Sequence, residues 1–158
     1  MRIETLVIVQ RDSKVLLGLK HSGKKFGGKW NGFGGGLEIG ETLEECARRE
    51  MLSETGATPK NLLKLGIINF HFPTDEQNHE VHIYQANDYE GKLNTLRDFI
   101  EYREFTLREL EKISHQMMPA DKYWLSIFIE KGCFRGEVYF DKEMKNPKVN
   151  IYRVENLD

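Results

Sequence analysis

The strongest constraint on the fold is the segment from Thr42 to Thr55, which carries the signals of an α-helix at both ends. Thr42 and Glu45 have the spacing of a capping box, in which each side chain bonds the other's backbone N–H. Gly56 follows the segment, and glycine is the usual residue where a helix ends in a left-handed conformation. The pattern therefore predicts a helix over residues 42–55.

Two carboxylates interrupt the apolar face of this predicted helix. At about 100° per residue, Glu50 and Glu54 fall one turn apart within the sector defined by Leu43, Ala47 and Met51. An unpaired buried carboxylate is costly, so it needs a proton, a cation or a metal. One explanation is an ion pair with a nearby arginine or a distant lysine. The other is a hard divalent cation such as Mg²⁺ or Mn²⁺, which prefers oxygen ligands.

The segment before the helix, residues 23–40, holds eight of the fourteen glycines. It is too long and too rich in glycine for an ordinary connection, which indicates a functional loop. Trp30 and Phe33 lie within it and argue against a flexible linker. Because glycine lets the backbone approach a ligand closely, N–H groups here can reach phosphate and carbonyls can reach a metal.

The rest of the chain predicts an α+β fold. A hairpin is expected from the strands 6–9 and 15–19, and further strands at 63–72, 80–86, 101–105, 134–140 and 149–154. Two more helices are expected at 106–113 and 119–131. Strands and helices do not alternate regularly, which excludes a simple βαβ architecture. We expect one domain over residues 1–158, a length that suits one hydrophobic core.

Composition excludes several classes of protein. The chain is 39% hydrophobic and 30% charged, which is typical of a globular protein rather than a disordered one. A net charge of −2 disfavours a long nucleic acid as partner, but not a small nucleotide. Cys46 and Cys133 make neither a disulfide framework nor a zinc cluster. No signal peptide or membrane-length apolar run is visible, so we expect a cytoplasmic monomer or homodimer with no membrane partner.

The segment from Gly35 to Ala57 resembles the Nudix box. The family pattern is G-x5-E-x7-R-E-U-x-E-E-x-G-U, where U is a bulky apolar residue, and only Ser53 departs from its fixed positions. WNGFGG at 30–35, PADKYW at 119–124 and FRGEVYF at 134–140 resemble segments of the Nudix enzymes that sanitise oxidised purine nucleoside triphosphates. Together these segments span most of the chain. The resemblance implies an α/β/α sandwich with a mixed β-sheet between helices.

The resemblance also implies an activity: hydrolysis of a nucleoside triphosphate to the monophosphate and pyrophosphate, with Mg²⁺ or, in its place, Mn²⁺. It assigns catalysis to Arg49, Glu50 and Glu54, and metal binding to Glu50, Glu54 and the Gly34 carbonyl. Arg49 would orient Glu50 by a charge-assisted hydrogen bond. The residues that match substrate-binding positions are Thr5, Lys20, Phe26, Asn31, Gly35, Phe70, Met118 and Asp121. Among these, Asn31 and Asp121 would read the purine edge.

Two departures from the family pattern concern the metal. Ser53 replaces a glutamate, so we expect weaker binding of a second or third metal ion. A further acidic ligand of the family falls on Phe99 here, with Asp98 and Glu101 as candidate substitutes.

Two more departures concern the base. Met118 replaces an aromatic residue that stacks on the base, and Ala120 replaces the first of two adjacent aspartates, which leaves Asp121. Both substitutions bear on base specificity rather than on the fold.

Three alternative functions stay open. The chain could cleave another nucleoside diphosphate-linked substrate, or be a non-catalytic nucleotide-binding Nudix module, which the loss of a carboxylate at Ser53 would favour. A P-loop is the third, because Gly23-x4-Gly28-Lys29 nearly matches its pattern. The P-loop is disfavoured because Trp30 stands where Ser or Thr must bind Mg²⁺, and the glycines that follow cannot begin a helix.

Overall fold

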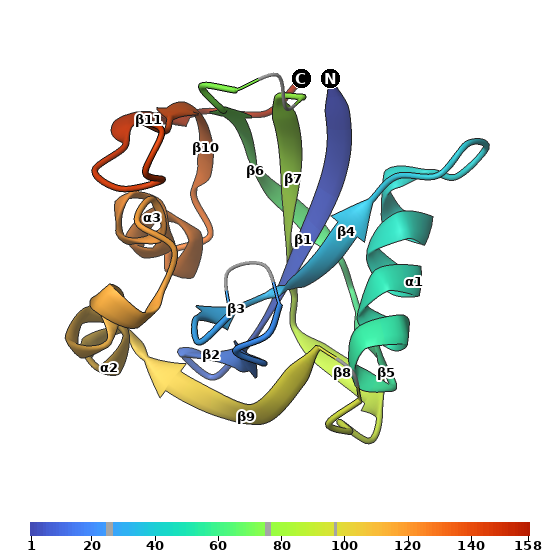
Figure 1. Ribbon diagram of the computed structural model, residues 1–158. Coiled ribbons are helices and arrows are strands. Elements are labelled where there is room, and N and C mark those ends of the chain that lie inside the picture. The colour runs from blue at the N-terminus through green and yellow to red at the C-terminus, as the bar shows by residue number, and fades with distance from the viewer. Residues whose placement is uncertain (25–26, 75–76, 97) are drawn as a thin grey trace.

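The computed structural model describes residues 1–24, 27–74, 77–96 and 98–158, and within them a mixed sheet of nine strands forms the centre of the molecule (Figure 1). The strands of this sheet are β1 (Arg2–Arg11), β2 (Lys14–Lys20), β3 (Trp30–Asn31), β4 (Phe33–Gly36), β6 (Leu63–His71), β7 (His79–Ala86), β9 (Phe99–Thr106), β10 (Cys133–Tyr139) and β11 (Lys148–Val154). Their order is β11-β10-β6-β7-β1-β2-β3, with β4 paired to β1 and β9 paired to β2. The pairs β1–β7 and β6–β10 are parallel, so the sheet is mixed.

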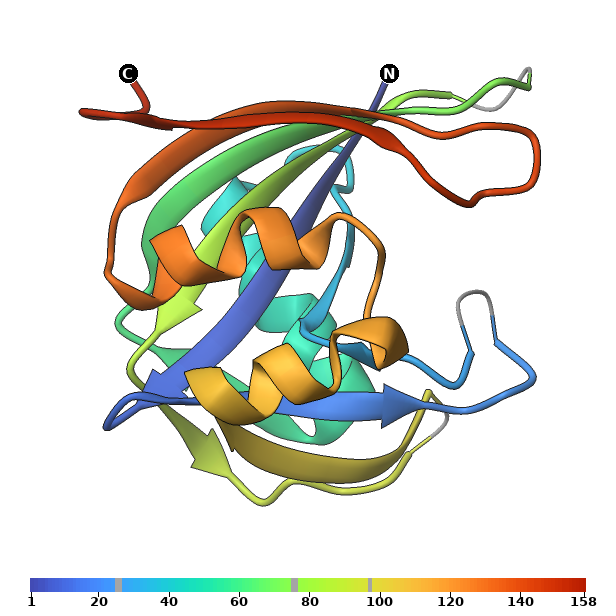
Figure 2. The ribbon, with the colours of Figure 1, turned by 90° about the vertical axis from the view of Figure 1, so that its left-hand side faces the viewer.

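Helices cover both faces of the sheet. Helix α1 (Leu43–Thr55) packs on one face, and α2 (Leu107–Lys112) and α3 (Leu125–Ile129) lie on the other (Figure 2). The 3₁₀ turns η1 (Ser114–Gln116) and η2 (Asp121–Tyr123) join α2 to α3. A separate hydrophobic core fills each interface, one under α1 and a larger one under α3. The expected α/β/α sandwich is therefore confirmed.

Strand β1 supplies side chains to both cores because successive residues of a strand point to opposite faces. Val7 and Val9 belong to the core under α1, and Ile8 belongs to the core under α3. The strand also changes partner along its length. Residues 4–7 pair with β4, whereas residues 9–11 pair with β2. This exchange places the glycine-rich β4 beside the first half of β1.

Several predicted elements are confirmed. β1 and β2 form the expected antiparallel hairpin. Helix α1 has Thr42 as its N-cap with both hydrogen bonds of the capping box, and Gly56 ends it with φ of 83°. Helix α2 has the second predicted capping box, between Thr106 and Glu109.

Other predictions were wrong in their detail. Part of the glycine-rich segment is strand, β3 and β4, because pairing with β2 and β1 overrides the low strand propensity of glycine. The expected helix 119–131 is broken into η2 and α3 at Trp124, whose φ of −120° is not helical and whose indole is buried against Phe134. A two-stranded sheet of β5 (Ala57–Lys60) and β8 (Asp88–Gly91) was not predicted.

Two further expectations concern a P-loop after Lys29 and a helix that could cross a membrane. Trp30 and Asn31 form strand β3 after Lys29, so no helix begins there and the P-loop alternative is excluded. In the described part of the chain, no helix is long and apolar enough to cross a membrane.

Candidate active site

Helix α1 presents two glutamates to the glycines of β4. Glu54 is only 7% exposed, and its Oε1 accepts the backbone N–H of Gly34 at 2.8 Å. A Cβ added at Gly35 would lie 2.5 Å from the carboxyl carbon of Glu50, and one at Gly34 would lie 1.8 Å from the backbone oxygen of Thr5. Gly34 therefore requires glycine, because its Cβ would meet backbone, whereas at Gly35 a Cβ would displace only the end of the Glu50 side chain.

The Glu54 carboxyl is in a strongly perturbed environment. Burial raises its pKa to about 8, and the nearby charges of Asp98 and Glu50 act in the same direction. The N–H of Gly34 and the charge of Lys20 oppose the rise. A bound cation would favour the charged form of such a carboxyl, as the sequence argument required.

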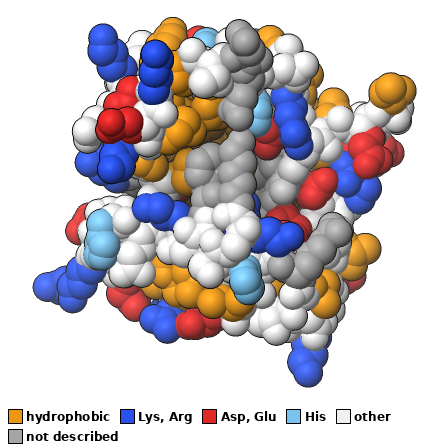
Figure 3. Space-filling model, viewed as in Figure 1, with side chains coloured by type: hydrophobic (Ala, Val, Ile, Leu, Met, Phe, Trp, Pro, Cys, Tyr) orange, Lys and Arg blue, Asp and Glu red, His pale blue; other side chains and the backbone are white. Residues whose placement is uncertain are grey.

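Arg49 ties the second glutamate to the loop between β4 and α1. Its Nη1 donates to Glu50 Oε1 at 2.7 Å, and its Nε and Nη2 donate to the two oxygens of Glu41 at 2.5 and 2.9 Å. Nη2 also donates to the Gly36 carbonyl at 3.0 Å. The hydrogen bonds from Arg49 lower the pKa of Glu41 to about 2. In Figure 3, acidic and basic side chains lie next to one another over β4 and α1.

Glu41 has a role in this arrangement, although it is not among the predicted site residues. Glu41 holds Arg49, and Arg49 in turn holds Glu50. The signal was present in the sequence, because Glu41 is a fixed position of the box that the chain resembles.

Of the two candidate substitutes for the additional acidic ligand, Asp98 and Glu101, Asp98 is the one whose charge acts on Glu54. Its charge contributes to the raised pKa of Glu54, and its side chain lies 3.7 Å from Lys24 Nζ. Phe99 is 1% exposed and belongs to the core under α1. Glu101 bonds Arg103 at 2.6 Å, and its side chain is 42% exposed.

The oxygen donors around Gly34 fit a hard divalent cation. Glu50 and Glu54 reach β4 from the same helix, and Asp98 acts on Glu54 from the loop before β9. Among the described residues, no group of three or more His, Cys, Asp or Glu side chains is close enough to hold a metal. Ser53, where the family has another glutamate, is exposed on α1. The donor set is therefore small.

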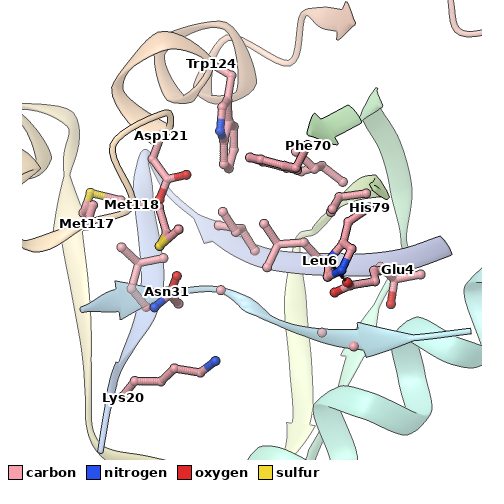
Figure 4. Close-up of a pocket in the computed structure, with 18 of the residues that line it drawn as sticks. Glu4, Leu6, Lys20, Asn31, Phe70, His79, Met117, Met118, Asp121 and Trp124 are labelled. Atoms are coloured by element: carbon pink, nitrogen blue, oxygen red, sulfur yellow. Dashed lines mark ion pairs between the residues drawn. The ribbon is translucent and has the colours of Figure 1, made fainter. Parts of the chain in front are cut away.

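A cavity of about 360 Å³ adjoins the glycine strand on the face opposite α1 (Figure 4). It brings together most of the predicted substrate and metal residues: Thr5, Lys20, Asn31, Gly34, Gly35, Glu54, Phe70, Met118 and Asp121. Its walls are otherwise mainly apolar, with side chains from β1, β7 and the segment around η2. Glu50 and Arg49 lie outside this lining, and the predicted residue Phe26 lies outside the described residues.

One end of the cavity carries the residues predicted to read a base. Asp121 and Asn31 lie there with Met118 between them (Figure 4). Burial raises the pKa of Asp121 to about 7, although the backbone of Met118 and the indole of Trp124 favour its charged form. Asn31 Nδ2 donates to the Lys29 carbonyl at 3.3 Å. The Asp121 carboxyl can therefore either accept or donate a hydrogen bond near neutral pH.

Trp124 and Phe70 form the wall above this end (Figure 4). Trp124 is 2% exposed and stacks on Phe134, with ring centroids 5.6 Å apart. Its Nε1 is buried and forms no hydrogen bond of good geometry among the described residues, although the indole is near enough to Asp121 to favour the charged carboxyl. Phe70 stacks on Phe140. The two rings give the cavity the flat apolar surface that an aromatic base prefers.

Thr5 is placed differently from what its assignment implies. It contributes to the cavity lining, but its hydroxyl forms a hydrogen bond with Cys46 Sγ at 3.4 Å, on the side of α1. The alternation along β1 explains this, since Glu4 and Leu6 are the neighbours on the opposite face. The Thr5 hydroxyl therefore joins β1 to α1.

The other end of the cavity holds a polar group that sequence reasoning missed. Arg2, Glu4 and His79 line it, and Glu4 forms an ion pair with Arg2 and contacts Nδ1 of His79. Arg2 and Glu4 belong to β1, whereas His79 begins β7, so only the parallel pairing of these strands brings them together. No local pattern could have indicated that pairing.

The comparisons with known proteins agree on one family. The model of the NUDIX domain matches residues 1–126. The chain is 40% identical over 141 residues to the oxidized purine nucleoside triphosphate hydrolase of Danio rerio, covering 88% of this chain and 86% of that protein. It is 36% identical over 143 residues to the protein of the same description in Mus musculus, covering 90% and 88%.

A solved structure supports the fold. The mutator MutT protein from Bacillus halodurans superposes with a TM-score of 0.76 over 95% of this chain and 98% of that one. At 21% sequence identity, this similarity bears on the architecture alone.

Proposed function

The chain belongs to the Nudix family of hydrolases, and from this membership we propose that it converts oxidised purine nucleoside triphosphates to the monophosphate and pyrophosphate with the aid of Mg²⁺. The observation that carries the proposal is the continuity of the cavity. One lining runs from Asn31 and Asp121 to Gly34 and Glu54, so a base and its phosphates can be held at the same time. The two related hydrolases from Danio rerio and Mus musculus support this choice of substrate.

The phosphate end would hold the cation through Glu50, Glu54 and the Gly34 carbonyl. A bound divalent cation neutralises phosphate charge and lowers the pKa of a bound water. Arg49 fixes the position of Glu50, and Glu41 fixes Arg49. Lys20 lines the cavity and acts electrostatically on Glu54, which suits it to an anionic substrate. Positioning and electrostatics then supply most of the rate acceleration, as in other phosphoryl transfers.

The base end would recognise a lactam edge. An oxidised or keto purine presents N–H donors beside C=O acceptors. Asp121, with a pKa near 7, can accept from such an N–H or, when protonated, donate to a carbonyl. The Asn31 side-chain carbonyl and amide add one of each kind. Met118 contributes a flexible, polarisable contact where an aromatic residue is usual in the family.

The proposal is tested by measuring Mg²⁺-dependent pyrophosphate release from a panel of oxidised and unmodified nucleoside triphosphates, nucleotide sugars and dinucleoside polyphosphates. We expect oxidised purine triphosphates to have the highest kcat/KM. A higher kcat/KM for a nucleoside diphosphate-linked compound would replace the substrate assignment. Tight nucleotide binding without turnover on any member would identify a binding module instead of an enzyme.

A further inference from the structure

Arg2 is a cation at the end of the cavity opposite the base-reading pair. Glu4, which lines the same end, is in register with Gly36, the last residue of β4. Asn31 precedes β4 and lies at the far end of that stretch of chain from Glu4 (Figure 4). The chain from Asn31 to Gly36 therefore passes from the base end, past the glycine that bonds Glu54, to the position beside Arg2.

The guanidinium of Arg2 lies against Gly36, in the place that a side chain there would take. A Cβ added at Gly36 would lie 2.9 Å from Nη2, 3.2 Å from Nε and 3.4 Å from Cζ of Arg2. The Cβ position of Gly35 faces Glu50 of α1, so that of Gly36 faces the opposite side, where the cavity lies. The absence of a side chain at Gly36 therefore lets a cation approach the glycine strand from the cavity.

Arg2 also borders the surroundings of both glutamates of α1. It lines the cavity of about 360 Å³ that contains Gly34 and Glu54. It also lines a neighbouring cavity of about 580 Å³ that contains Gly36 and Glu50. Among the described residues, no other cationic side chain lines both. A phosphate chain that begins beside Gly34 can therefore extend to Arg2.

Arg2 has hydrogen-bond donors beyond those that its ion pair uses. Its closest contact with Glu4 is from Nε, which lies 3.4 Å from Oε1, and Nδ1 of His79 contacts the same oxygen. Within the described ranges, Glu4 is the only ion-pair partner of Arg2. The two NH₂ groups are thus further donors on a side chain that Glu4 holds in place. A planar guanidinium of this kind suits a phosphate, which can accept two parallel hydrogen bonds from it.

Resting on the proposed function, we propose that Arg2 binds the terminal phosphate of the nucleoside triphosphate, which is part of the pyrophosphate that leaves. The base-reading pair, the glycine beside Glu54 and Arg2 follow one another in the order in which a triphosphate presents its base, its first phosphate and its last. As pyrophosphate leaves, negative charge increases on it, and a fixed cation stabilises that charge. Arg2 is therefore a specificity-determining residue for the length of the phosphate chain.

The alternative is that Arg2 is a solvated arginine, since its side chain is 52% exposed, or that it only holds Glu4. Neither role depends on how many phosphates the ligand carries. Two variants separate these roles from phosphate binding. Arg2→Gln removes the charge, whereas Arg2→Lys keeps the charge but not the planar pair of NH₂ groups.

The first experiment measures kcat/KM for 8-oxo-dGTP and the inhibition constant of 8-oxo-dGMP, which has the base and the first phosphate but neither of the others. In Arg2→Gln we expect kcat/KM to fall at least about ten-fold, the loss typical of hydrogen bonds between charged groups, and the inhibition constant to stay unchanged. Arg2→Lys should lose less. Arg153→Gln is the matched control, because the Arg153 side chain is 56% exposed, pairs with Glu130 and lines neither cavity.

A second experiment uses inorganic tripolyphosphate with Mg²⁺, a probe that has no nucleoside, and measures its binding by calorimetry. Arg2→Gln should weaken this binding at least about ten-fold, and Arg153→Gln should not. A wild type that binds tripolyphosphate but cleaves no oxidised purine triphosphate would refute the proposed function alone.

Three results would overturn the assignment of Arg2. The first is an unchanged kcat/KM for 8-oxo-dGTP in Arg2→Gln. The second is an equal loss in kcat/KM for 8-oxo-dGTP and in the affinity for 8-oxo-dGMP. The third is a tripolyphosphate affinity that is the same in the wild type and Arg2→Gln, or too weak to measure in both. Should Arg2→Gln fail to show a cooperative thermal unfolding transition, Arg2→Lys replaces it, and full tripolyphosphate affinity and full kcat/KM in that variant would count against the assignment.

Discussion

Two residues of the candidate site, Glu54 and Asp121, have carboxyl groups whose pKa values are far above the ordinary range. Glu54 and Asp121 are carboxyls whose pKa values are raised to about 8 and about 7, in both cases chiefly by burial. A position that serves stability alone would hold an apolar residue there, because a buried carboxyl destabilises the folded state. They lie at different ends of one cavity, one beside Gly34 and the other beside Met118. Strongly perturbed groups that share a cavity are typical of functional sites.

At Glu54, charge rather than shape should decide activity. Glu54→Gln keeps an oxygen that can accept the N–H of Gly34, so the fold should persist. It removes the negative charge that would bind the cation, so we expect Mg²⁺-dependent turnover to fall by roughly two orders of magnitude or more. Steady-state pyrophosphate release, with thermal unfolding as a check on folding, measures this. Glu44→Gln, an exposed glutamate on the same helix, is the control. Unchanged turnover in Glu54→Gln would contradict the metal assignment.

At Asp121, the raised pKa predicts how stability depends on pH. The ordinary value is 3.8 and the folded value is about 7, so the folded state holds its proton more tightly than the unfolded state. Stability from the neutral carboxyl is complete at low pH and is lost as the pH rises through about 7. Asp121→Asn cannot ionise, so its Tm should match that of the wild type near pH 4 and exceed it by about 2 °C or more at pH 7.5.

The control for this pH series is Asp12→Asn, because Asp12 is exposed in the turn between β1 and β2. Its Tm should follow that of the wild type at both pH values. If Asp121→Asn shows the same Tm difference at pH 4 and pH 7.5, the Asp121 carboxyl is not held in its neutral form.

At the scale of the elements, α1 and β4 together position the acidic groups of the candidate site. Helix α1 is fixed at Thr42 by its capping box and ends at Gly56, so Glu50 and Glu54 are carried on a rigid element. β4 is held by β1, and it contributes two glycines where any side chain would collide. The site depends on the spacing between these two elements.

A Gly35→Ala substitution tests that spacing. The new Cβ would lie 2.5 Å from the Glu50 carboxyl carbon, and this carboxylate is the movable end of a flexible side chain. We therefore expect little change in Tm but a loss of kcat of about ten-fold or more, because misplacement of a catalytic group by about 1 Å is costly. Gly23→Ala is the control, since its nearest neighbour would be His21 at 3.4 Å. A fully active Gly35→Ala would show that Glu50 does not need this position.

The elements also show how far the sequence predicts the structure. The helix at α1 and the hairpin of β1 and β2 were predictable because their signals are local: caps, periodicity and a short turn. Strand β4 was not, since glycine has low strand propensity and only its pairing with distant β1 makes it a strand. The position of Trp124, which interrupts the expected last helix, depends on burial against Phe134.

The same distinction holds within the site. Glu50, Glu54 and Arg49 could be assigned because a fixed spacing on one helix carries them. The grouping of Arg2, Glu4 and His79 could not, since residues more than seventy positions apart meet only through the parallel β1–β7 pairing. The orientation of the Thr5 hydroxyl toward Cys46 likewise depends on which face of the sheet α1 covers.

At the scale of the whole molecule, the acidic groups of α1 and the base-reading Asp121 come from elements on opposite faces of the sheet. Helix α1 lies on one face of the sheet and α3 on the other (Figure 1). The acidic groups come to β4 from α1, and residues around η2 line the cavity together with β1 and β7. A substrate would bind across this arrangement, with its base under Trp124 and its phosphates at Gly34 and Gly35. Specificity and hydrolysis are thus assigned to opposite ends of one cavity, and they can be altered separately.

The most direct test of this separation is the kcat/KM of Asp121→Ala on 8-oxo-dGTP and on unmodified dCTP. The account predicts a loss of at least about ten-fold on the oxidised purine triphosphate and a much smaller loss on the pyrimidine triphosphate, because it assigns Asp121, at one end of the cavity, to the purine edge. Equal losses on both substrates would contradict the assignment of base recognition to this end of the cavity.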